Sequence, residues 1–261
     1  MKKIIEELWN SYRELTPSVS RVQEILDLNN QGFFSDHIAF RTISHPKFNK
    51  EQLAYRFIKK GYYIKGYYRF YTKKLRAIHL EHSDPNLPRI FISEIVLEDV
   101  SFYTRDLLIK AFNHIPRSFD NILKHGRNWK VSHFVYNQLQ EESEYAAWLY
   151  VHGLRPNHFT LNVNKLKFHS IDSVCALISD SGIKMNTSGG LIKGSAYFGL
   201  KQASTIADQI PIVFEDVNEP ILTPSCYIEF AERFKKNNAL FSGFITSSAD
   251  RIFESTNKKL A

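Results

Sequence analysis

The segment DHIAFRT, residues 36–42, alternates between apolar and polar side chains and predicts a half-buried β-strand. Successive side chains of a strand point to opposite faces. Ile38 and Phe40 therefore share one face, while His37 and Arg41 share the other. We expect the apolar face to pack beneath a helix and the polar face to line a cleft.

Two further segments show the same alternation around a residue that can ionise. In NHFTLNV, residues 157–163, His158 lies on the polar face and Phe159 on the apolar face. In CYIEF, residues 226–230, Glu229 alternates with apolar neighbours. If the three strands lie in one sheet, their polar faces meet in one cleft.

An internal repeat predicts that these strands do come together. His37 is followed 24 residues later by Gly61, and His158 is followed 24 residues later by Gly182. Each glycine falls where the end of a helix favours a left-handed backbone. The two predicted helices cover residues 50–60 and 168–180. Because further strand-like segments follow each helix, we interpret the chain as a duplicated βαβββ unit.

The duplication organises the rest of the chain into a single compact domain. We expect N-terminal helices at 1–30, a first module at 35–100, a helical connector at 101–155, a second module at 156–234 and a tail at 235–261. Within the connector, residues 141–152 predict a helix that stops at Gly153. The loop SGGLIKGS, residues 188–195, is expected to account for the greater length of the second module.

His37, His158 and Glu229 are the candidate metal ligands. Two imidazoles and one carboxylate, with open positions left over, form the ligand set suited to non-haem Fe(II) oxygen chemistry. Glu229 also lies in an apolar strand, where an unpaired carboxylate is costly to bury. The three residues therefore predict a metal site in the cleft.

Other ionisable residues compete for a place in that site. The duplication gives Glu94, in RIFISEIV, the position that Glu229 has in the second half. Glu94 is therefore a possible fourth ligand. His79 and His82, in LRAIHLEH, form a short HxxH pair that we interpret as structural residues or as residues that support the metal ligands from behind.

The net charge favours an anionic partner. The 261-residue chain has a formal net charge of +7 at pH 7. Basic and aromatic residues interleave at residues 55–76, a pattern that could bind single-stranded nucleic acid. A solvated helix end and strand face explain the same pattern, so we expect no nucleic-acid partner. The SGGLIKGS loop lacks the spacing of a phosphate-binding Walker motif.

The remaining composition indicates a protein of the reduced cytoplasm. The chain has no run of about 18 apolar residues, so no membrane span is expected. The opening MKKIIEELWN predicts an amphipathic helix instead of a signal peptide. Cys175 and Cys226 are the only cysteines in the sequence and give no disulfide framework. We therefore expect a cytoplasmic location.

A set of motifs in this chain resembles a known family. They are DHIAFRT, NHFT, GLKQASTIAD, YIEFAER and ADRIFEST, within about residues 35–256. In combination they are similar to the 2-oxoadipate dioxygenase/decarboxylase family, formerly known only as a domain of unknown function. This family belongs to the vicinal-oxygen-chelate, or glyoxalase-like, superfamily. The resemblance implies an α+β fold in which duplicated βαβββ modules form a curved sheet around a metal cleft, with added helices.

The resemblance also implies roles for the candidate residues. His37, His158 and Glu229 would bind Fe(II), although another divalent metal is possible. Arg41 would bind a substrate carboxylate and so take part in catalysis. It lies four residues after His37 on the same face, at about 3.3 Å per residue. Its guanidinium could therefore fork a carboxylate of the chelated acid.

The implied reaction is oxidative decarboxylation of a 2-oxo dicarboxylic acid, with 2-oxoadipate converted to 2-hydroxyglutarate and CO2. The partners would be the anionic 2-oxo acid and O2, without an organic cofactor. The tail would close one end of the cleft, where Thr246 and Ser247 would contact the substrate. Two alternatives stay open: a glyoxalase-like lyase or isomerase, favoured if Glu94 binds metal, and a non-catalytic binding protein.

Overall fold

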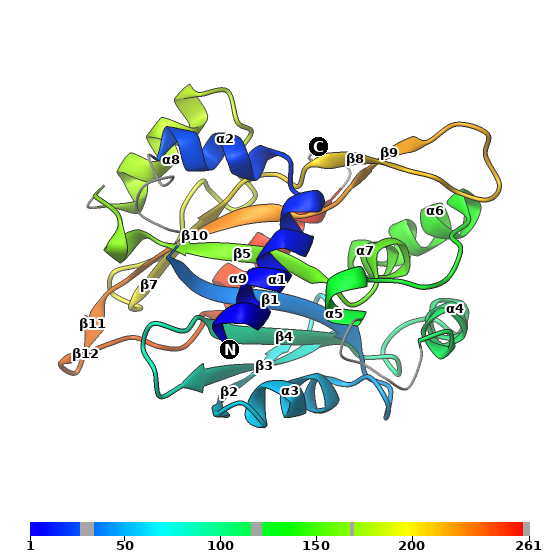
Figure 1. Ribbon diagram of the computed structural model, residues 1–261, viewed down its shortest axis with the longest axis horizontal. Coiled ribbons are helices and arrows are strands. Elements are labelled where there is room, and N and C mark those ends of the chain that lie inside the picture. The colour runs from blue at the N-terminus through cyan, green and yellow to red at the C-terminus, as the bar shows by residue number, and fades with distance from the viewer. Residues whose placement is uncertain (27–33, 116–121, 168–169, 258–261) are drawn as a thin grey trace.

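One sheet of eight strands forms the centre of the molecule and curls into a half-barrel (Figure 1). Its strand order is β2-β3-β4-β1-β5-β10-β7-β6. The computed structural model describes residues 1–26, 34–115, 122–167 and 170–257. Among these residues, no helix is both long enough and apolar enough to cross a membrane.

Each half of the sheet is one βαβββ module. The first module contains β1 (Ser35–Ile43), α3 (Lys50–Ile58), β2 (Tyr62–Phe70), β3 (Leu75–His82) and β4 (Arg89–Ile95). The second contains β5 (Pro156–Asn162), α8 (Ile171–Asp180), β6 (Lys193–Ser195), β7 (Leu200–Ser204) and β10 (Tyr227–Arg233). From the centre outward, the strand orders β1-β4-β3-β2 and β5-β10-β7-β6 correspond. The predicted duplication and the α+β fold are confirmed.

The two module helices end as the repeat predicted. Gly61 follows α3 with a φ of +94°, and Gly182 follows α8 with a φ of +83°. Both values lie in the left-handed region that favours glycine. The predicted start of the second helix at residue 168 lies outside the described residues. The helix itself begins at Ile171, where the hydroxyl of Ser170 accepts a hydrogen bond from the backbone N–H of Ser173.

The greater length of the second module has a different source from the one expected. The loop at residues 188–195 contributes β6, which pairs with β7 in the main sheet. The additional length is a separate hairpin, β8 (Gln209–Ile212) and β9 (Ile221–Pro224), inserted between β7 and β10. A second short hairpin, β11 (Lys235–Lys236) and β12 (Ala239–Leu240), follows β10.

The remaining described elements are helices, and all but η2, which lies between β5 and α8, stand outside the modules. They are α1 (Lys2–Glu14), α2 (Ser18–Ile25), α4 (Phe102–Asn113), α5 (Ile122–His125), α6 (His133–Glu142), α7 (Glu144–His152), η2 (Val163–Lys165), α9 (Thr246–Phe253) and η3 (Glu254–Thr256). The prediction of a single helix over residues 141–152 is wrong, because α6 ends at Glu142 and α7 begins at Glu144. Ser143 has an extended backbone that ends α6, and its hydroxyl accepts from the backbone N–H of Ala146 to cap α7. The stop at Gly153 is confirmed.

Helices cover the apolar face of the sheet, as the alternation predicted. Helix α1 crosses the central strands (Figure 1), and the ring of its Tyr12 lies 5.0 Å from that of Phe159. On the first module, the ring of Phe40 lies 5.7 Å from that of Phe57 in α3. The opposite face, which carries His37, is covered by the tail and by α7.

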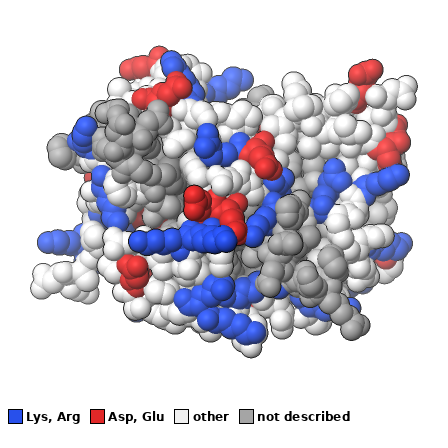
Figure 2. Space-filling model, in the orientation of Figure 1, with Lys and Arg blue, Asp and Glu red and all other residues white. Residues whose placement is uncertain are grey.

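Basic side chains are spread unevenly over the outside. On the face shown in Figure 2, Lys and Arg gather at the lower edge over α3, while Asp and Glu lie near the centre and along the upper and right edges. Helix α3 packs on the apolar side of the first module. This surface charge therefore lies on the opposite side of the sheet from His37.

Candidate metal centre

Three central strands place His37, His158 and Glu229 on one face of the sheet. Across the antiparallel pair β1–β5, His37 lies opposite Thr160, and Ala39 lies opposite His158. Across the parallel pair β5–β10, Glu229 also lies opposite Thr160. Since paired residues point to the same side of a sheet, the polar faces predicted for the three strands meet.

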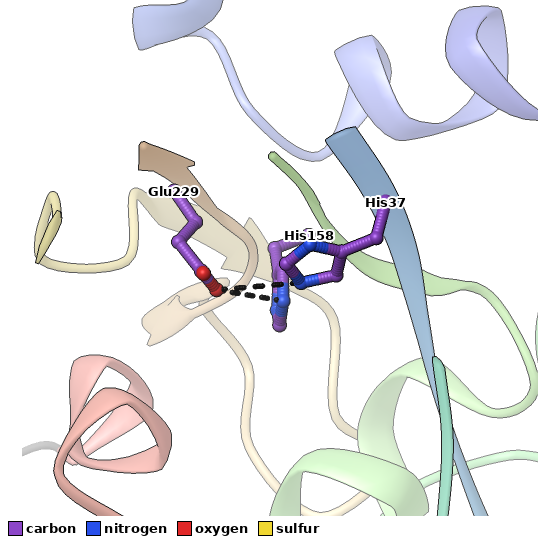
Figure 3. A group of neighbouring side chains, drawn as sticks. All are labelled: His37, His158 and Glu229. Carbon is purple, nitrogen blue, oxygen red and sulfur yellow. Dashed lines mark ion pairs between the residues drawn. The ribbon is translucent and has the colours of Figure 1, made fainter. Parts of the chain in front are cut away.

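The three side chains converge at a distance that suits one metal ion (Figure 3). Their ligand atoms all lie within 4.8 Å of one another. Oε2 of Glu229 is 3.0 Å from Nε2 of His158 and 3.7 Å from Nε2 of His37. Ligands about 2.1 Å from an ion are separated from each other by roughly 3 to 4 Å. All three side chains are buried.

The residue before each histidine orients its ring. Nδ1 of His37 lies 2.9 Å from Oδ1 of Asp36, and Nδ1 of His158 lies 3.1 Å from Oδ1 of Asn157. In this arrangement each Nδ1–H donates to an oxygen, which leaves the lone pair on Nε2 facing the centre. Metal-binding histidines commonly have such an acceptor behind them.

The ligand atoms that face the centre have few hydrogen-bond partners among the surrounding described residues. Within the described residues, neither Nε2 of His158 nor Oε2 of Glu229 has a hydrogen-bond partner outside the three-residue group. The other carboxylate oxygen of Glu229 accepts from Nε2 of Gln202 at 2.6 Å. Nε2 of His37 lies 3.1 Å from the hydroxyl of Thr160, a group that can rotate away. Buried polar atoms normally have partners, so this donor set fits a divalent cation.

The protonation states also suit metal binding. Burial lowers the pKa of His158, although the carboxylate of Glu229 opposes that effect. Burial alone would raise the pKa of Glu229, but the electrostatic interaction with the His37 ring and the close contact with Nε2 of His158 outweigh it, so this pKa is lowered. Neutral imidazole and ionised carboxylate are the forms that bind metals.

A buried ion pair holds Asp36 in place behind His37. Arg233 donates from Nε and Nη2 to the two oxygens of Asp36 at 2.7 and 2.8 Å. Burial would raise the pKa of Asp36, but Arg233 and Arg89 hold it well below its usual value. Nη1 of Arg233 donates to two backbone carbonyls in the tail segment 241–243. The pair therefore connects β1, β10 and the tail.

Arg41 lies on the same face as His37, four residues further along β1. It is 1% exposed, and its Nη2 donates to the hydroxyl of Thr256 at 3.1 Å. Its Nε and Nη1 have no hydrogen-bond partner in the part of the chain that the structure describes. The guanidinium carbon lies 4.7 and 5.1 Å from the ring centres of Tyr145 and Trp148. A buried cation with unpaired donors is costly, and a carboxylate would satisfy it.

Glu94 takes no part in this centre, which corrects the fourth-ligand expectation. The β1–β4 register places it opposite Thr42, so it faces away from the histidines. Its carboxylate accepts from the backbone N–H and the ammonium of Lys50, each at 2.9 Å, and from Arg76 at 3.0 Å. Glu94 is therefore an ion-pair partner on the helix-covered side of the sheet.

The first-module counterpart of Glu229 is Phe91. In the second module, Glu229 lies opposite Thr160, two residues after the candidate ligand histidine. In the first module, the residue two positions after the histidine is Ala39, and Phe91 lies opposite it. An apolar ring therefore occupies the position where a second carboxylate of the duplication would stand.

The tail covers the polar face, but through other residues than those expected. Thr246 and Ser247 are exposed at the start of α9, which weighs against the expected substrate contact. The ring of Phe244 packs on His37 at 4.8 Å between centres. Thr256, in η3, contacts Arg41 as described above.

His79 and His82 stand outside the three-residue group, in agreement with the structural interpretation. Nδ1 of His79 lies 2.8 Å from the hydroxyl of Tyr68, and burial lowers its pKa to about 4. Nε2 of His82 lies 3.2 Å from the backbone carbonyl of Lys60. Both rings are engaged by neighbouring residues of the first module.

Sequence reasoning missed Tyr227 and Gln202. Tyr227 precedes Glu229 by two residues, so the alternation in CYIEF already placed it on the polar face. Its ring stacks on His158 at 4.6 Å. Burial raises the pKa of Tyr227, an effect that the charge of Arg41 opposes. Gln202 reaches Glu229 through the pairing of β7 with β10, which no local pattern reveals.

Comparisons with known proteins agree with the motifs of the chain. A family model described as 2-oxoadipate dioxygenase/decarboxylase matches residues 4–125 and 117–240. The Arabidopsis thaliana protein named 2-oxoadipate dioxygenase/decarboxylase, chloroplastic, is 32% identical over 289 residues. That alignment covers 98% of this chain and 77% of the plant protein.

Solved structures are similar over most of the chain. The crystal structure of hydroxyglutarate synthase in complex with 2-oxoadipate from Oryza sativa is 30% identical with a TM-score of 0.91. The match covers 99% of this chain and 92% of that one. A Ralstonia eutropha protein provisionally assigned to the glyoxalase superfamily shares the fold, at 17% identity and a TM-score of 0.73. It matches 92% of this chain and 84% of its own.

Proposed function

This chain belongs to the 2-oxoadipate dioxygenase/decarboxylase family, and from that premise we propose that its buried centre converts 2-oxoadipate and O2 to 2-hydroxyglutarate and CO2. The reaction balances, because one oxygen atom of O2 enters the new carboxylate and the other enters the new hydroxyl. The observation that carries the proposal is the group His37, His158 and Glu229 beside a buried arginine with unpaired donors.

In this proposal His37, His158 and Glu229 hold a divalent metal, which we take to be Fe(II). Two neutral imidazoles and one carboxylate would leave a divalent ion with one net positive charge, which attracts an anionic 2-oxo acid. Bound iron would supply the open coordination positions and the redox chemistry of a non-haem oxygenase. Asp36 and Asn157 would keep the two imidazole rings in their binding orientation.

Arg41 is proposed to bind a carboxylate of the substrate. Its unpaired Nε and Nη1 donors could form two charge-assisted hydrogen bonds, which are stronger than neutral ones. The rings of Tyr145 and Trp148 lie against the guanidinium and keep water from it. Low local polarity strengthens the attraction between the guanidinium and an anion.

The glyoxalase-like alternative would use a fourth protein ligand. Glu94 faces the other side of the sheet, and Phe91 has the position of the missing carboxylate. These placements favour three protein ligands and an open coordination sphere. We therefore prefer the oxygenase to the lyase or isomerase.

Oxygen uptake tests the proposal. Protein loaded anaerobically with Fe(II) is mixed with 2-oxoadipate and O2, and the products are identified by mass spectrometry. We expect one 2-hydroxyglutarate and one CO2 for each O2 consumed, and a loss of more than about a hundredfold in rate after His37→Ala. His82→Ala is the matched control, because His82 contacts the backbone of Lys60 and Asp84 and the ring of Tyr62, all outside the centre, and should leave the rate unchanged. Metal binding without O2 uptake would contradict the oxygenase assignment.

A further inference from the structure

Tyr227 lies between the proposed metal centre and Arg41 on the polar face of the sheet. It is directly opposite His158, and His158 is opposite Ala39. Along β1, Ala39 lies between His37 and Arg41, and all three point to the same face. Tyr227, His158 and Ala39 therefore form a row across the three strands, and this row lies between His37 and Arg41 on the same face of the sheet.

The ring of Tyr227 is held more firmly than its hydroxyl. The side chain is fully buried, and the ring stacks on His158 with an angle of 28° between planes. The backbone carbonyl of Tyr227 accepts from the hydroxyl of Tyr12 at 2.7 Å. The hydroxyl of Tyr227 interacts with the side chain of Arg41, but it has no hydrogen-bond partner of normal geometry among residues with a described position. A buried tyrosine hydroxyl normally has one.

Two neighbouring groups thus present unused donors to one region. Arg41 offers Nε and Nη1 from β1, and Tyr227 offers its hydroxyl from β10. The phenol oxygen can accept from the guanidinium, but its own proton then still needs an acceptor. A carboxylate has two oxygens with about four acceptor sites and can satisfy both groups together.

We propose that Tyr227 donates a hydrogen bond to the substrate carboxylate that Arg41 binds, and that the two residues together select a 2-oxo dicarboxylic acid over a 2-oxo monocarboxylic acid. This inference rests on the proposed function. It adds a second recognition group for the carboxylate remote from the metal. The ring of Tyr227, stacked on His158, would keep that group at a fixed distance from the metal centre.

Substrate binding without turnover tests the inference. Fe(II)-loaded protein is titrated anaerobically by calorimetry with 2-oxoadipate and with 2-oxohexanoate, which has the same chain length but no remote carboxylate. For Tyr227→Phe we expect about tenfold weaker binding of 2-oxoadipate, which corresponds to about 1.4 kcal/mol. Binding of 2-oxohexanoate and of Fe(II) should stay within about twofold of the wild type, because the ring and its stacking are retained.

Tyr12→Phe is the matched control. It also removes one buried tyrosine hydroxyl, and it loosens the backbone of Tyr227 without touching the proposed carboxylate site. It should lower the unfolding midpoint without changing the ratio of the two affinities. Equal weakening of both acids by Tyr227→Phe, or no weakening, would overturn the inference. If wild-type protein binds Fe(II) but not 2-oxoadipate, the proposed function itself fails, and the inference fails with it.

Discussion

A guanidinium group lies wholly inside this protein, and two of its nitrogen donors have no hydrogen-bond partner among the described residues. Arg41 donates to Thr256, and the aromatic rings of Tyr145, Trp148 and Phe253 surround its charge. Such rings attract a cation but accept no strong hydrogen bond. The arrangement costs stability in the absence of an anion and is therefore expected to be functional.

Replacing Arg41 with lysine separates charge from geometry. Arg41→Lys keeps the positive charge but loses the planar fork that binds a carboxylate through two hydrogen bonds. We expect the KM for 2-oxoadipate to rise about ten- to a hundredfold while Fe(II) affinity changes less than twofold. Steady-state kinetics and metal titration check this. Thr256→Val is the control, since it removes only the existing partner and should change KM by less than about threefold.

The wrong prediction for Glu94 arose because its order in the repeat was used and its strand face was not. In RIFISEIV, Glu94 shares its strand face with Ile90 and Ile92, while the buried Phe91 and Ile95 share the other face. Parity groups Glu94 with two isoleucines, and the register with β1 puts that face on the side of the sheet away from the histidines. The alternation of strand residues correctly predicted the side of the sheet to which His37 and Glu229 point. The role of Glu94 was predicted only from its order in the repeat.

At the level of elements, the repeat spacing predicted the two modules. In each module the helix is followed by a glycine with a left-handed backbone, at the same distance along the sequence from the histidine. The β8–β9 hairpin could not be located in this way, because it pairs only with itself. Ser143 divides the connector helix through a local cap, a signal that the apolar periodicity on both sides obscured. The link from Gln202 to Glu229 depends on long-range strand pairing.

The Asp36–Arg233 pair joins the tail and two strands that belong to different modules. Its loss should therefore lower the stability of the whole fold. Arg233→Met leaves the buried carboxylate of Asp36 unpaired on that side, and such changes typically cost about 3–5 kcal/mol. We expect the free energy of unfolding, measured in urea, to fall by about that amount. The double variant Asp36→Asn with Arg233→Met should be less destabilised than the sum of its single variants. Simple additivity would contradict the coupling.

At the scale of the whole molecule, the candidate ligands come from both modules. His37 belongs to the first, while His158 and Glu229 belong to the second. Strands β1 and β5 meet at the centre of the sheet, so a metal there would bridge the two halves. We propose on this basis that the modules act as one domain.

Metal binding should therefore stabilise the entire fold. At a free Fe(II) concentration a hundred times the Kd, a ligand specific for the folded state adds about 2.7 kcal/mol to the free energy of unfolding. We expect a single unfolding transition that moves to higher temperature with Fe(II) under anaerobic conditions. In His158→Ala the shift should disappear. Two separate transitions, of which only one responds to metal, would contradict the single-domain proposal.

Phe91 gives the duplication an evolutionary consequence. A symmetric ancestor with a carboxylate in each copy would have held its metal with four side chains, which leaves one open coordination position fewer than three ligands do. Replacing one of them by phenylalanine removes a ligand and a negative charge without moving a strand, and the new ring packs against Phe244 at 4.8 Å. Gene duplication followed by one such loss is thus a short route from a four-ligand metal site to the three-ligand site proposed here, which has one more open position for O2 beside a chelating acid.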